Sequence, residues 1–293
     1  MKQARLFAVL SALIVLFGLL LSQPGIAEED DDPALAEGAE LRIMSYNLMH
    51  PDWTHIKVNG RDELVAAILM YYRPDVVAVQ EAGAKWHKAL IPLLMENGSY
   101  ATACRQSNAD GFLYCTTCFF YNPETVKPVE EYIWDVEMKS ASRVFSVAVF
   151  ERIGDGARFA VTNTHPAPRD EPKKYASNMA SITAYAAEAA EKFDGLPLII
   201  AGDFNTPEDA EAYFSLMDAA GVRDAKFEAK TLVRSYPTYF GYQVIPSPDN
   251  MDYCVDHLFV NDKIDVLLYN AVIGHDVQDA SDHIPIYIDI AFK

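Results

Sequence analysis

The stretch Leu198–Pro207, LIIAGDFNTP, leaves this chain few possible folds. Four apolar residues lead into a glycine, and Asp203 and Asn205 follow two residues apart. A short apolar run that ends in turn residues is typical of a buried strand. The acid and the amide are therefore expected where this strand ends, at the rim of a sheet. A helix that is capped by Thr206, with Asp209 completing a capping box, is predicted to follow.

The first 27 residues have the pattern of a secretory signal peptide. Lys2 and Arg5 precede an apolar run from Leu6 to Leu21, and Gly25-Ile26-Ala27 forms a small-x-small cleavage site. We therefore expect cleavage after Ala27 and a secreted or periplasmic mature protein without a stable membrane span. The alternative, a permanent membrane anchor, is disfavoured because the apolar run is short for a span.

Residues 28–39 are expected to form an acidic disordered tether, since Glu28–Asp32 is a purely acidic run. Residues 40–293 suit one large domain, because they contain no internal repeat and no Gly/Ser-rich linker. Without residues 1–27 the chain has 22 basic against 42 acidic residues, a net charge near −20. Nucleic acid is thus possible as a partner but disfavoured, because such a surface repels phosphate backbones unless a basic patch or bound cations offset it.

The chain contains four cysteines: Cys104, Cys115, Cys118 and Cys254. Export permits disulfides. One or two bridges, such as Cys104 to Cys115 or to Cys118 across a hairpin, are favoured over a CxxC metal or redox site, because the CxxC pair stands in an apolar, strand-like run. The pairing stays open on sequence alone.

Strand and helix signals together predict an α/β (α+β) fold. Strands are expected over residues 41–48, 76–81, 111–121, 144–150, 158–164, 198–203, 251–260 and 284–290, and helices over 61–73, around 86–94 and over 173–193. The middle of the chain is dominated by antiparallel-type strands. This pattern fits two packed mixed or antiparallel sheets with helices outside, a four-layered α/β sandwich.

Polar side chains stand at five of these strand ends, which suggests one shared rim. They are Asn47, Glu81, His165, Asp203 with Asn205, and Asp282 with His283. Asn47, Glu81 and Asp282 offer only oxygen ligands, which suit Mg²⁺ or Mn²⁺ better than zinc. The remaining amide, imidazoles and carboxylate could serve a phosphoryl group, as hydrogen-bond donors and as an activator of water.

Six short motifs in register resemble the endonuclease/exonuclease/phosphatase superfamily, which has the DNase I-like fold. They are Ser45-Tyr46-Asn47-Leu48, Val79-Gln80-Glu81, Asn163-Thr164-His165, Gly202-Asp203-Phe204-Asn205, Val255-Asp256-His257 and Ser281-Asp282-His283. The resemblance covers residues 41–292, nearly the whole mature chain. It implies a metal-dependent phosphoesterase with a four-layered α/β sandwich.

The resemblance also implies a metal site and a water site. Glu81, helped by Asn47 and Asp282, would hold the divalent metal ion. Asp203 would orient or activate the attacking water. One departure concerns Met49, because some relatives have a second acid or amide at this position. Met49 adds no obvious metal ligand.

The other residues of the motifs are implied to act on the phosphoryl group. Asn205 and His165 would bind it and stabilise its pentacovalent transition state. His283 would be the second imidazole, with Asp256 accepting its other N–H and fixing its tautomer. His257 is expected to be structural, since neighbouring strand residues point in opposite directions. A second departure follows His165: many relatives have an arginine in the next helix, where this chain has Lys173-Lys174-Tyr175.

The sequence thus predicts a secreted, Mg²⁺- or Mn²⁺-dependent hydrolase of phosphodiesters or phosphomonoesters, with a small or lipid-like substrate favoured. A secreted nuclease with the same chemistry, and a catalytically silent binding protein on this scaffold, are the alternatives. The complete set of polar strand ends argues against the silent protein. The sequence does not determine the oligomeric state.

Overall fold

The structure is a computed structural model, and it describes residues 34–50, 60–96, 99–107, 113–114, 116–137, 143–241 and 251–293. The predicted signal peptide and the acidic run after it lie outside these residues. Two later residues of the predicted tether contact the domain: Ala36 N–H donates to Asp289 over 2.9 Å, and Ala34 O accepts from Arg42 over 2.8 Å. No helix in the described ranges is long and apolar enough to cross a membrane.

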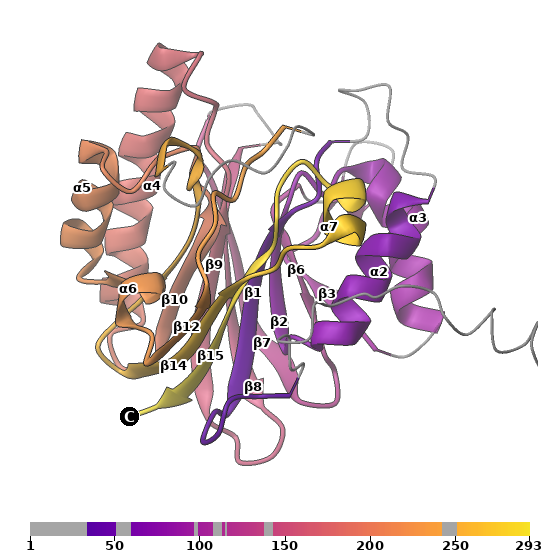
Figure 1. Ribbon diagram of the computed structural model, residues 1–293. Coiled ribbons are helices and arrows are strands. Elements are labelled where there is room, and N and C mark those ends of the chain that lie inside the picture. The colour runs from indigo at the N-terminus through magenta and orange to yellow at the C-terminus, as the bar shows by residue number, and fades with distance from the viewer. Residues whose placement is uncertain are drawn as a thin grey trace, which may run out of the picture. The chain divides into compact units, whose positions relative to one another are not determined.

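Two sheets form the centre of the domain (Figure 1). The seven-stranded sheet has the order β12 (Thr231–Arg234), β14 (Ile264–Ala271), β15 (Ile286–Phe292), β1 (Leu41–Asn47), β2 (Val76–Gln80), β6 (Cys118–Tyr121) and β3 (Ala101–Ala103). The six-stranded sheet has the order β11 (Arg223–Asp224), β13 (Asp256–Val260), β10 (Leu198–Asp203), β9 (Arg158–Thr164), β8 (Val144–Arg152) and β7 (Val126–Asp135). Both sheets are mixed, because the pairs β1–β2, β9–β10 and β12–β14 are parallel. The short strands β4 (Gln106–Ser107) and β5 (Leu113–Tyr114) pair separately.

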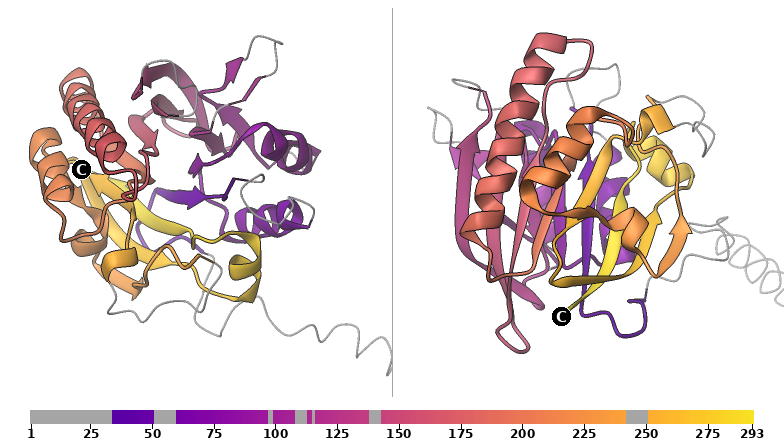
Figure 2. Two further views of the ribbon diagram at one scale, coloured as in Figure 1. Left: turned by 90° about the horizontal axis from the view of Figure 1, so that it is seen from above. Right: turned by 90° about the vertical axis from the view of Figure 1, so that its left-hand side faces the viewer.

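Helices cover the outer faces of both sheets (Figures 1 and 2). The seven-stranded sheet is covered by α2 (Arg61–Tyr72), α3 (Ala84–Glu96) and the short α7 (His275–Ala280). The six-stranded sheet is covered by α4 (Pro172–Lys192) and α5 (Glu211–Ala220), with the single turns α6 (Ala225–Glu228) and η1 (Met251–Tyr253) in later loops. The predicted four-layered α/β sandwich is therefore confirmed.

The position of β10 between two apolar cores explains why its sequence is apolar up to Gly202. Ile199 and Ala201 belong to the core that includes the space between the sheets, whereas Leu198 and Ile200 pack in the core beneath α4 and α5. A strand that is covered on both faces needs apolar residues at every position. The polar residues can therefore begin only where the strand leaves both cores, after Gly202.

The helix after β10 begins later than the sequence predicts. It starts at Glu211 with Ala210 as its N-cap, because the chain first makes a turn in which Ala210 N–H donates to Pro207 O over 3.1 Å. The predicted cap at Thr206 is therefore wrong. The Thr206 hydroxyl instead donates to Phe204 O over 2.7 Å, which closes the loop that carries Asn205.

Other differences from the predicted elements concern turns and edge strands. The predicted strand over 111–121 is divided between β5 and β6, and η1 occupies the start of the predicted strand over 251–260. The predicted ranges do not include strands β3, β4, β7, β11, β12 and β14 or helices α6 and α7. A Cys104–Cys118 bridge, one of the pairings that the sequence leaves open, is not formed: Cys104 Sγ lies 3.3 Å from Val147 O, and Cys118 Sγ lies 3.9 Å from His87 Nε2. Cys254 is a buried thiol, and Cys115 lies outside the described residues.

A buried amide joins the two sheets close to the rim. Asn163 Nδ2 on β9 donates to backbone carbonyls of β2 and β6, each over 2.8 Å. Its Oδ1 accepts from Gln80 Nε2 on β2 over 2.8 Å. Gln80 immediately precedes Glu81, and Asn163 lies two residues before His165. These bonds therefore fix the separation of two predicted site residues that belong to different sheets.

His257 on β13 holds the loop after β10. Its Nε2 lies 2.7 Å from Thr206 O and its Nδ1 lies 3.3 Å from Asp224 Oδ2. Burial alone would lower the pKa of His257, but Asp224 and the Thr206 carbonyl raise it above its usual value. A protonated ring can donate through both nitrogens. Beside it, Lys226 Nζ lies 2.5 Å from Glu208 Oε1, so the two acids of this network are matched by two cations.

We predict that Gly202→Ala will destabilise the protein and displace the ends of β9 and β10. A Cβ at this position would lie 2.4 Å from Thr164 O, a contact that the paired backbones cannot relieve without separating. We expect a cost of about 1–3 kcal/mol in the free energy of unfolding, as for other overpacked positions. Urea denaturation measures this. Gly195→Ala is the control, because its Cβ would meet nothing within 4 Å. Equal stability of the two variants would contradict the prediction.

We predict that His257 will stabilise the fold more at low pH than at high pH. Because folding raises its pKa, the stabilisation is fully present below its usual value near 6.5 and is lost as the pH rises through the folded value. The free energy of unfolding should therefore differ more between wild type and His257→Gln at about pH 5.5 than at about pH 8.5. Asp224→Asn should remove this pH dependence. A gap between wild type and His257→Gln that is constant with pH would show that the ring is neutral.

Candidate active site

The ends of both sheets meet around a cavity of about 450 Å³. Six of the eight residues that the sequence predicts for the site line it: Glu81, His165, Asp203, Asn205, Asp282 and His283. The other two, Asn47 and Asp256, lie directly behind this lining and hydrogen bond to it. Segments from both halves of the chain therefore contribute to one cavity.

Three residues of the lining have left-handed backbone conformations. The φ angles are 55° at Met49, 58° at Glu81 and 50° at Asn205. Such angles are uncommon for residues other than glycine, and strained residues gather at functional sites. Asn tolerates this conformation, and here its N–H donates to Asp203 Oδ1 over 2.8 Å. These local turns direct the side chains after β1, β2 and β10 to the cavity.

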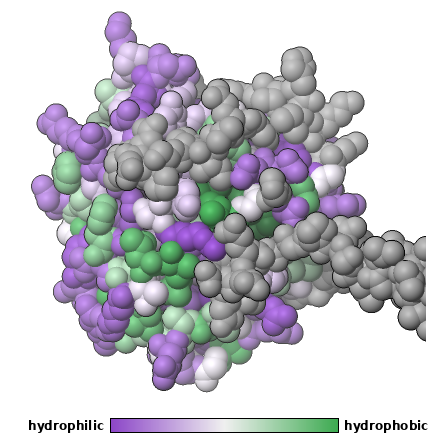
Figure 3. Space-filling view, viewed as in Figure 1, coloured by the Kyte–Doolittle hydropathy of each residue, from purple (hydrophilic) through white to green (hydrophobic). Residues whose placement is uncertain are grey.

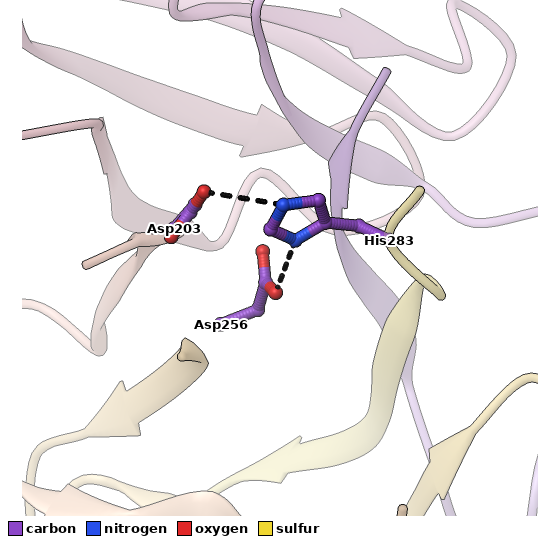
Figure 4. A group of neighbouring side chains, drawn as sticks. All are labelled: Asp203, Asp256 and His283. Carbon is purple, nitrogen blue, oxygen red and sulfur yellow. Dashed lines mark hydrogen bonds and ion pairs between the residues drawn. The ribbon is translucent and has the colours of Figure 1, made fainter. Parts of the chain in front are cut away.

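His283 lies between two carboxylates (Figure 4). Its Nδ1 is 2.8 Å from Asp256 Oδ2, and its Nε2 is 3.7 Å from Asp203 Oδ2. Burial alone would lower the pKa of His283, but Asp256 and Asp203 raise it to about 10. The imidazole is therefore protonated at neutral pH and offers a charged N–H donor on the cavity side.

Asp203 is buried at the end of β10, and its carboxylate is held from two directions. Asn47 Nδ2 donates to its Oδ2 over 2.9 Å, and Asn205 N–H donates to its Oδ1. Burial and the neighbouring Asp256 raise the pKa of Asp203 to about 7. A carboxyl group with a pKa near the working pH is suited to accept a proton from water.

His165 and Asn205 add neutral groups to the cavity. His165 Nε2 lies 3.4 Å from Asp203 Oδ2 and 3.9 Å from Glu81 Oε1. Burial, with Arg143 and His283 as further causes, lowers the pKa of His165 well below its usual value, so this imidazole is neutral. Asn205 Nδ2 lies 3.3 Å from Pro166 O, in the loop that follows His165.

Glu81, Asp282 and Asn47 form the predicted metal-ligand side. Burial and the negative charge of Glu81 raise the pKa of Asp282, and Asp282 Oδ1 is buried without a hydrogen-bond partner among the described residues. Two carboxylates that face each other, one with an unsatisfied oxygen, fit a divalent cation. Asn47 Nδ2 lies 3.4 Å from Glu81 Oε1, and its Oδ1 accepts from Met49 N–H over 2.9 Å. The amide thus connects the metal-ligand side with Asp203.

Two tighter acid–histidine groups fit a metal ion less well. In Asp203–Asp256–His283 and in Glu208–Asp224–His257, the ligand atoms lie within 4.8 Å of one another. In both groups, however, the histidine pKa is raised and each ring nitrogen faces an oxygen. A metal ion needs an unprotonated ring nitrogen. Both groups are therefore weaker metal sites than the pair Glu81 and Asp282, and the second group supports the loop after β10.

Arg143 is a cavity residue that sequence reasoning did not select. It stands just before β8, and its Nη1 donates to His165 O over 3.1 Å and to Pro166 O over 2.7 Å. Its guanidinium thus brings positive charge to the loop that follows His165. In the sequence, Arg143 is a single arginine in front of an apolar strand. Such an arginine is common in proteins and usually has no functional role.

Buried polar contacts align the metal-ligand side. Ser281 Oγ donates to Asn47 O over 2.6 Å and accepts from His283 N–H over 3.2 Å. Arg61 on α2 donates to Ala280 O over 2.7 Å and also to Leu48 O. These bonds tie the end of β1 to the segment that carries Asp282.

Comparison with known proteins agrees with this geometry. The sequence model of the Endonuclease/Exonuclease/phosphatase family matches residues 44–283. No match was found among curated protein sequences.

Solved structures show the same fold at low sequence identity. An endonuclease/exonuclease/phosphatase from Bacteroides vulgatus is 18% identical, with a TM-score of 0.72 over 86% of this chain and 99% of that one. A mannosyl-6-phosphatase from Bacteroides thetaiotaomicron is 17% identical, with a TM-score of 0.69 over 86% and 100%. ANGEL2, a 2′,3′-cyclic phosphatase, is 14% identical, with a TM-score of 0.64 over 85% and 95%. With its family match and this architecture, the chain belongs to the Endonuclease/Exonuclease/phosphatase family and has its phosphoesterase fold.

Proposed function

We propose that this protein is an exported, Mg²⁺- or Mn²⁺-dependent phosphoesterase that hydrolyses a small phosphodiester or phosphomonoester by in-line attack of water. One observation carries the proposal. A carboxylate with a pKa near 7, a neutral imidazole and a protonated imidazole face the same cavity, beside Glu81 and an Asp282 oxygen that has no hydrogen-bond partner among the described residues. Export rests on the signal peptide predicted for residues 1–27.

Asp203 is the proposed activator of water. Its carboxylate is fixed by Asn47 and by the Asn205 N–H, so a lone pair remains for a water molecule in the cavity. Its raised pKa lets it take a proton near neutral pH. Asp256 is not one of the residues that line the cavity, and its proposed role is to keep His283 protonated and oriented.

The proposed phosphoryl site consists of hydrogen-bond donors that the fold holds in place. His283 offers a charged N–H, while His165 and Asn205 offer a neutral imidazole and an amide. Arg143 adds a guanidinium beside them. Donors that are already aligned where negative charge develops stabilise the transition state without reorganisation.

Glu81 and Asp282, with Asn47 beside them, are the residues that would hold Mg²⁺ or Mn²⁺. The unpartnered Asp282 oxygen and the mutual repulsion of the two acids support this assignment. A bound divalent ion supplies positive charge that neutralises developing negative charge on the phosphoryl group and its leaving oxygen.

A small substrate is supported by the size and the charge of the cavity. Its volume of about 450 Å³ is in the range of small-molecule sites. The permanently positive side chains in its lining are Arg143 and Arg169, whereas a nuclease needs a basic groove that follows a phosphate backbone. Two relatives of the same fold are described as a mannosyl-6-phosphatase and a 2′,3′-cyclic phosphatase, which agrees with a small phosphate ester.

We predict that Asp203→Asn and His283→Gln will each lower kcat by about 10²–10⁴-fold, because each removes an acid–base group of the proposed reaction. The melting temperature should change little, since both side chains stand at the rim outside the two apolar cores. Asp265→Asn is the matched control, because this acid pairs with surface lysines.

The assay should compare bis-aryl phosphate, hexose phosphate, a phospholipid, plasmid DNA and RNA. Turnover of small esters but not of polynucleotides supports the proposal. Preferred cleavage of DNA or RNA would make the protein a nuclease. If a folded, metal-bound protein turned over none of the substrates, it would be a silent binding protein. A variant at Asp203 or His283 that kept most of its rate would refute the assigned roles.

We also predict that Mg²⁺ or Mn²⁺ will raise the melting temperature of chelator-treated wild-type protein. An ion that binds the folded state alone stabilises it by mass action. Glu81→Gln and Asp282→Asn should abolish most of this shift, because each removes a carboxylate ligand. Differential scanning fluorimetry measures it without any substrate. Undiminished shifts in both variants would place the ion elsewhere.

A further inference from the structure

Two tyrosines stand at the mouth of the cavity and are not used by the proposed chemistry. Tyr239 is 37% exposed and Tyr253 is 40% exposed, and both line the cavity. Large aromatic side chains usually lose most of their exposure on folding, since their area contributes strongly to the core. Rings that stay open on a cavity wall are therefore available to a ligand.

The two rings extend the surface that begins at His283. The centroids of Tyr239 and His283 lie 5.0 Å apart, and those of Tyr239 and Tyr253 lie 6.2 Å apart with their planes at 31°. The spacing of 6.2 Å leaves no room for a third ring between the tyrosines. They thus form one continuous wall, and a group attached to the reacting phosphorus would meet it within one ring spacing of His283.

Backbone and hydroxyl contacts hold this wall in place. Tyr239 N–H donates to Tyr253 O over 3.0 Å. The Thr238 hydroxyl accepts from Val255 N–H over 3.1 Å and from Asp256 N–H over 3.0 Å. The same segment that carries the tyrosines is thus tied to the strand end that orients His283. A ring surface that is fixed before binding loses little entropy when a ligand stacks on it.

Polar side chains next to the wall favour hydroxyl groups over a second phosphate. Arg169 Nη2 donates to Asp252 O over 3.0 Å, which fixes a guanidinium beside Tyr253. Asp170, which follows Arg169, and Asp252, which precedes Tyr253, also line the cavity, so acids outnumber the one arginine here. Carboxylates accept hydrogen bonds from hydroxyls, but they repel an additional anionic group.

We propose that Tyr239 and Tyr253 bind the organic group of the substrate, and that this group is a ring that carries hydroxyls. The substrate class is therefore a monomeric phosphate ester of a sugar or of a nucleoside, whose sugar ring or base stacks on the wall while the sugar hydroxyls meet Arg169, Asp170 and Asp252. This inference rests on the proposed function, because it assumes a phosphoryl group at His283.

The test compares kcat/KM for a hexose phosphate, a nucleoside monophosphate and glycerol phosphate, which has hydroxyls but no ring. Tyr253→Ala is the informative variant, because Tyr253 lies one ring away from His283 and does not stack against it. Phe227→Ala is the control. Phe227 on α6 is 64% exposed, and it is not among the residues that line the cavity. Figure 3 shows an apolar surface where Figure 1 draws α6 and β12.

We expect wild type to prefer at least one of the ring-bearing esters over glycerol phosphate. Tyr253→Ala should reduce this preference about tenfold, mainly through KM, because stacking on an aromatic face is lost. Tyr253→Phe should retain it, since the ring rather than the hydroxyl does the stacking. The ester that loses the most identifies the natural ring as a sugar or a nucleoside.

Two outcomes would overturn the inference. One is a wild-type protein that hydrolyses glycerol phosphate as well as both ring-bearing esters. The other is a Tyr253→Ala variant that loses activity on all three substrates equally, as a merely structural residue would. If wild type hydrolysed none of the three and also left bis-aryl phosphate intact, the result would instead count against the proposed function, so the two failures are distinguishable.

Discussion

The buried amide of Asn163 is the contact on which the site most directly depends. It joins β9 to carbonyls of β2 and β6 and to the Gln80 side chain, across the space between the sheets. Apolar packing between sheets is non-directional, so it tolerates sliding. Hydrogen bonds in a low-dielectric interior do not, because a displaced amide would be left unsatisfied. The separation of Glu81 and His165 is thus set by these three bonds rather than by the apolar core.

The buried charges behind the loop after β10 are arranged differently from the charges in the cavity. Behind the loop, Glu208 and Asp224 are matched by Lys226 and His257, so this buried cluster is closed within the chain. In the cavity the positive charge of His283 is opposed by several acids, and Asp282 retains an unpartnered oxygen. Burying unmatched charge destabilises a fold. A cation and a phosphoryl group would together supply the charges and the acceptors that this arrangement lacks.

The sequence predicted best those parts that periodicity and local motifs determine. Strands buried on both faces, such as β10, have apolar residues at every position, and the polar residues at their ends were predicted to meet at one rim. The sequence predicted least well those features that tertiary contacts determine. Thr206 has the sequence signature of a helix cap, yet its hydroxyl closes the loop at Phe204. Arg143 and the tyrosine wall come from segments whose local sequence gives no sign of the cavity. Edge strands such as β12 are short and partly exposed, so their patterns are weak.

The difference between Glu208 and Asp282 shows how a functional acid can be told from a structural one. Both have a carboxylate oxygen without a partner. The other oxygen of Glu208 lies 2.5 Å from Lys226 Nζ, so the ammonium group neutralises the negative charge of this carboxylate. Asp282 instead faces Glu81, and burial together with the negative charge of Glu81 raises the pKa of Asp282. An unsatisfied oxygen alone is therefore weak support for a ligand. An unsatisfied oxygen beside a second acid, on a cavity wall and next to left-handed backbone at Glu81, points more strongly to a partner from outside the chain.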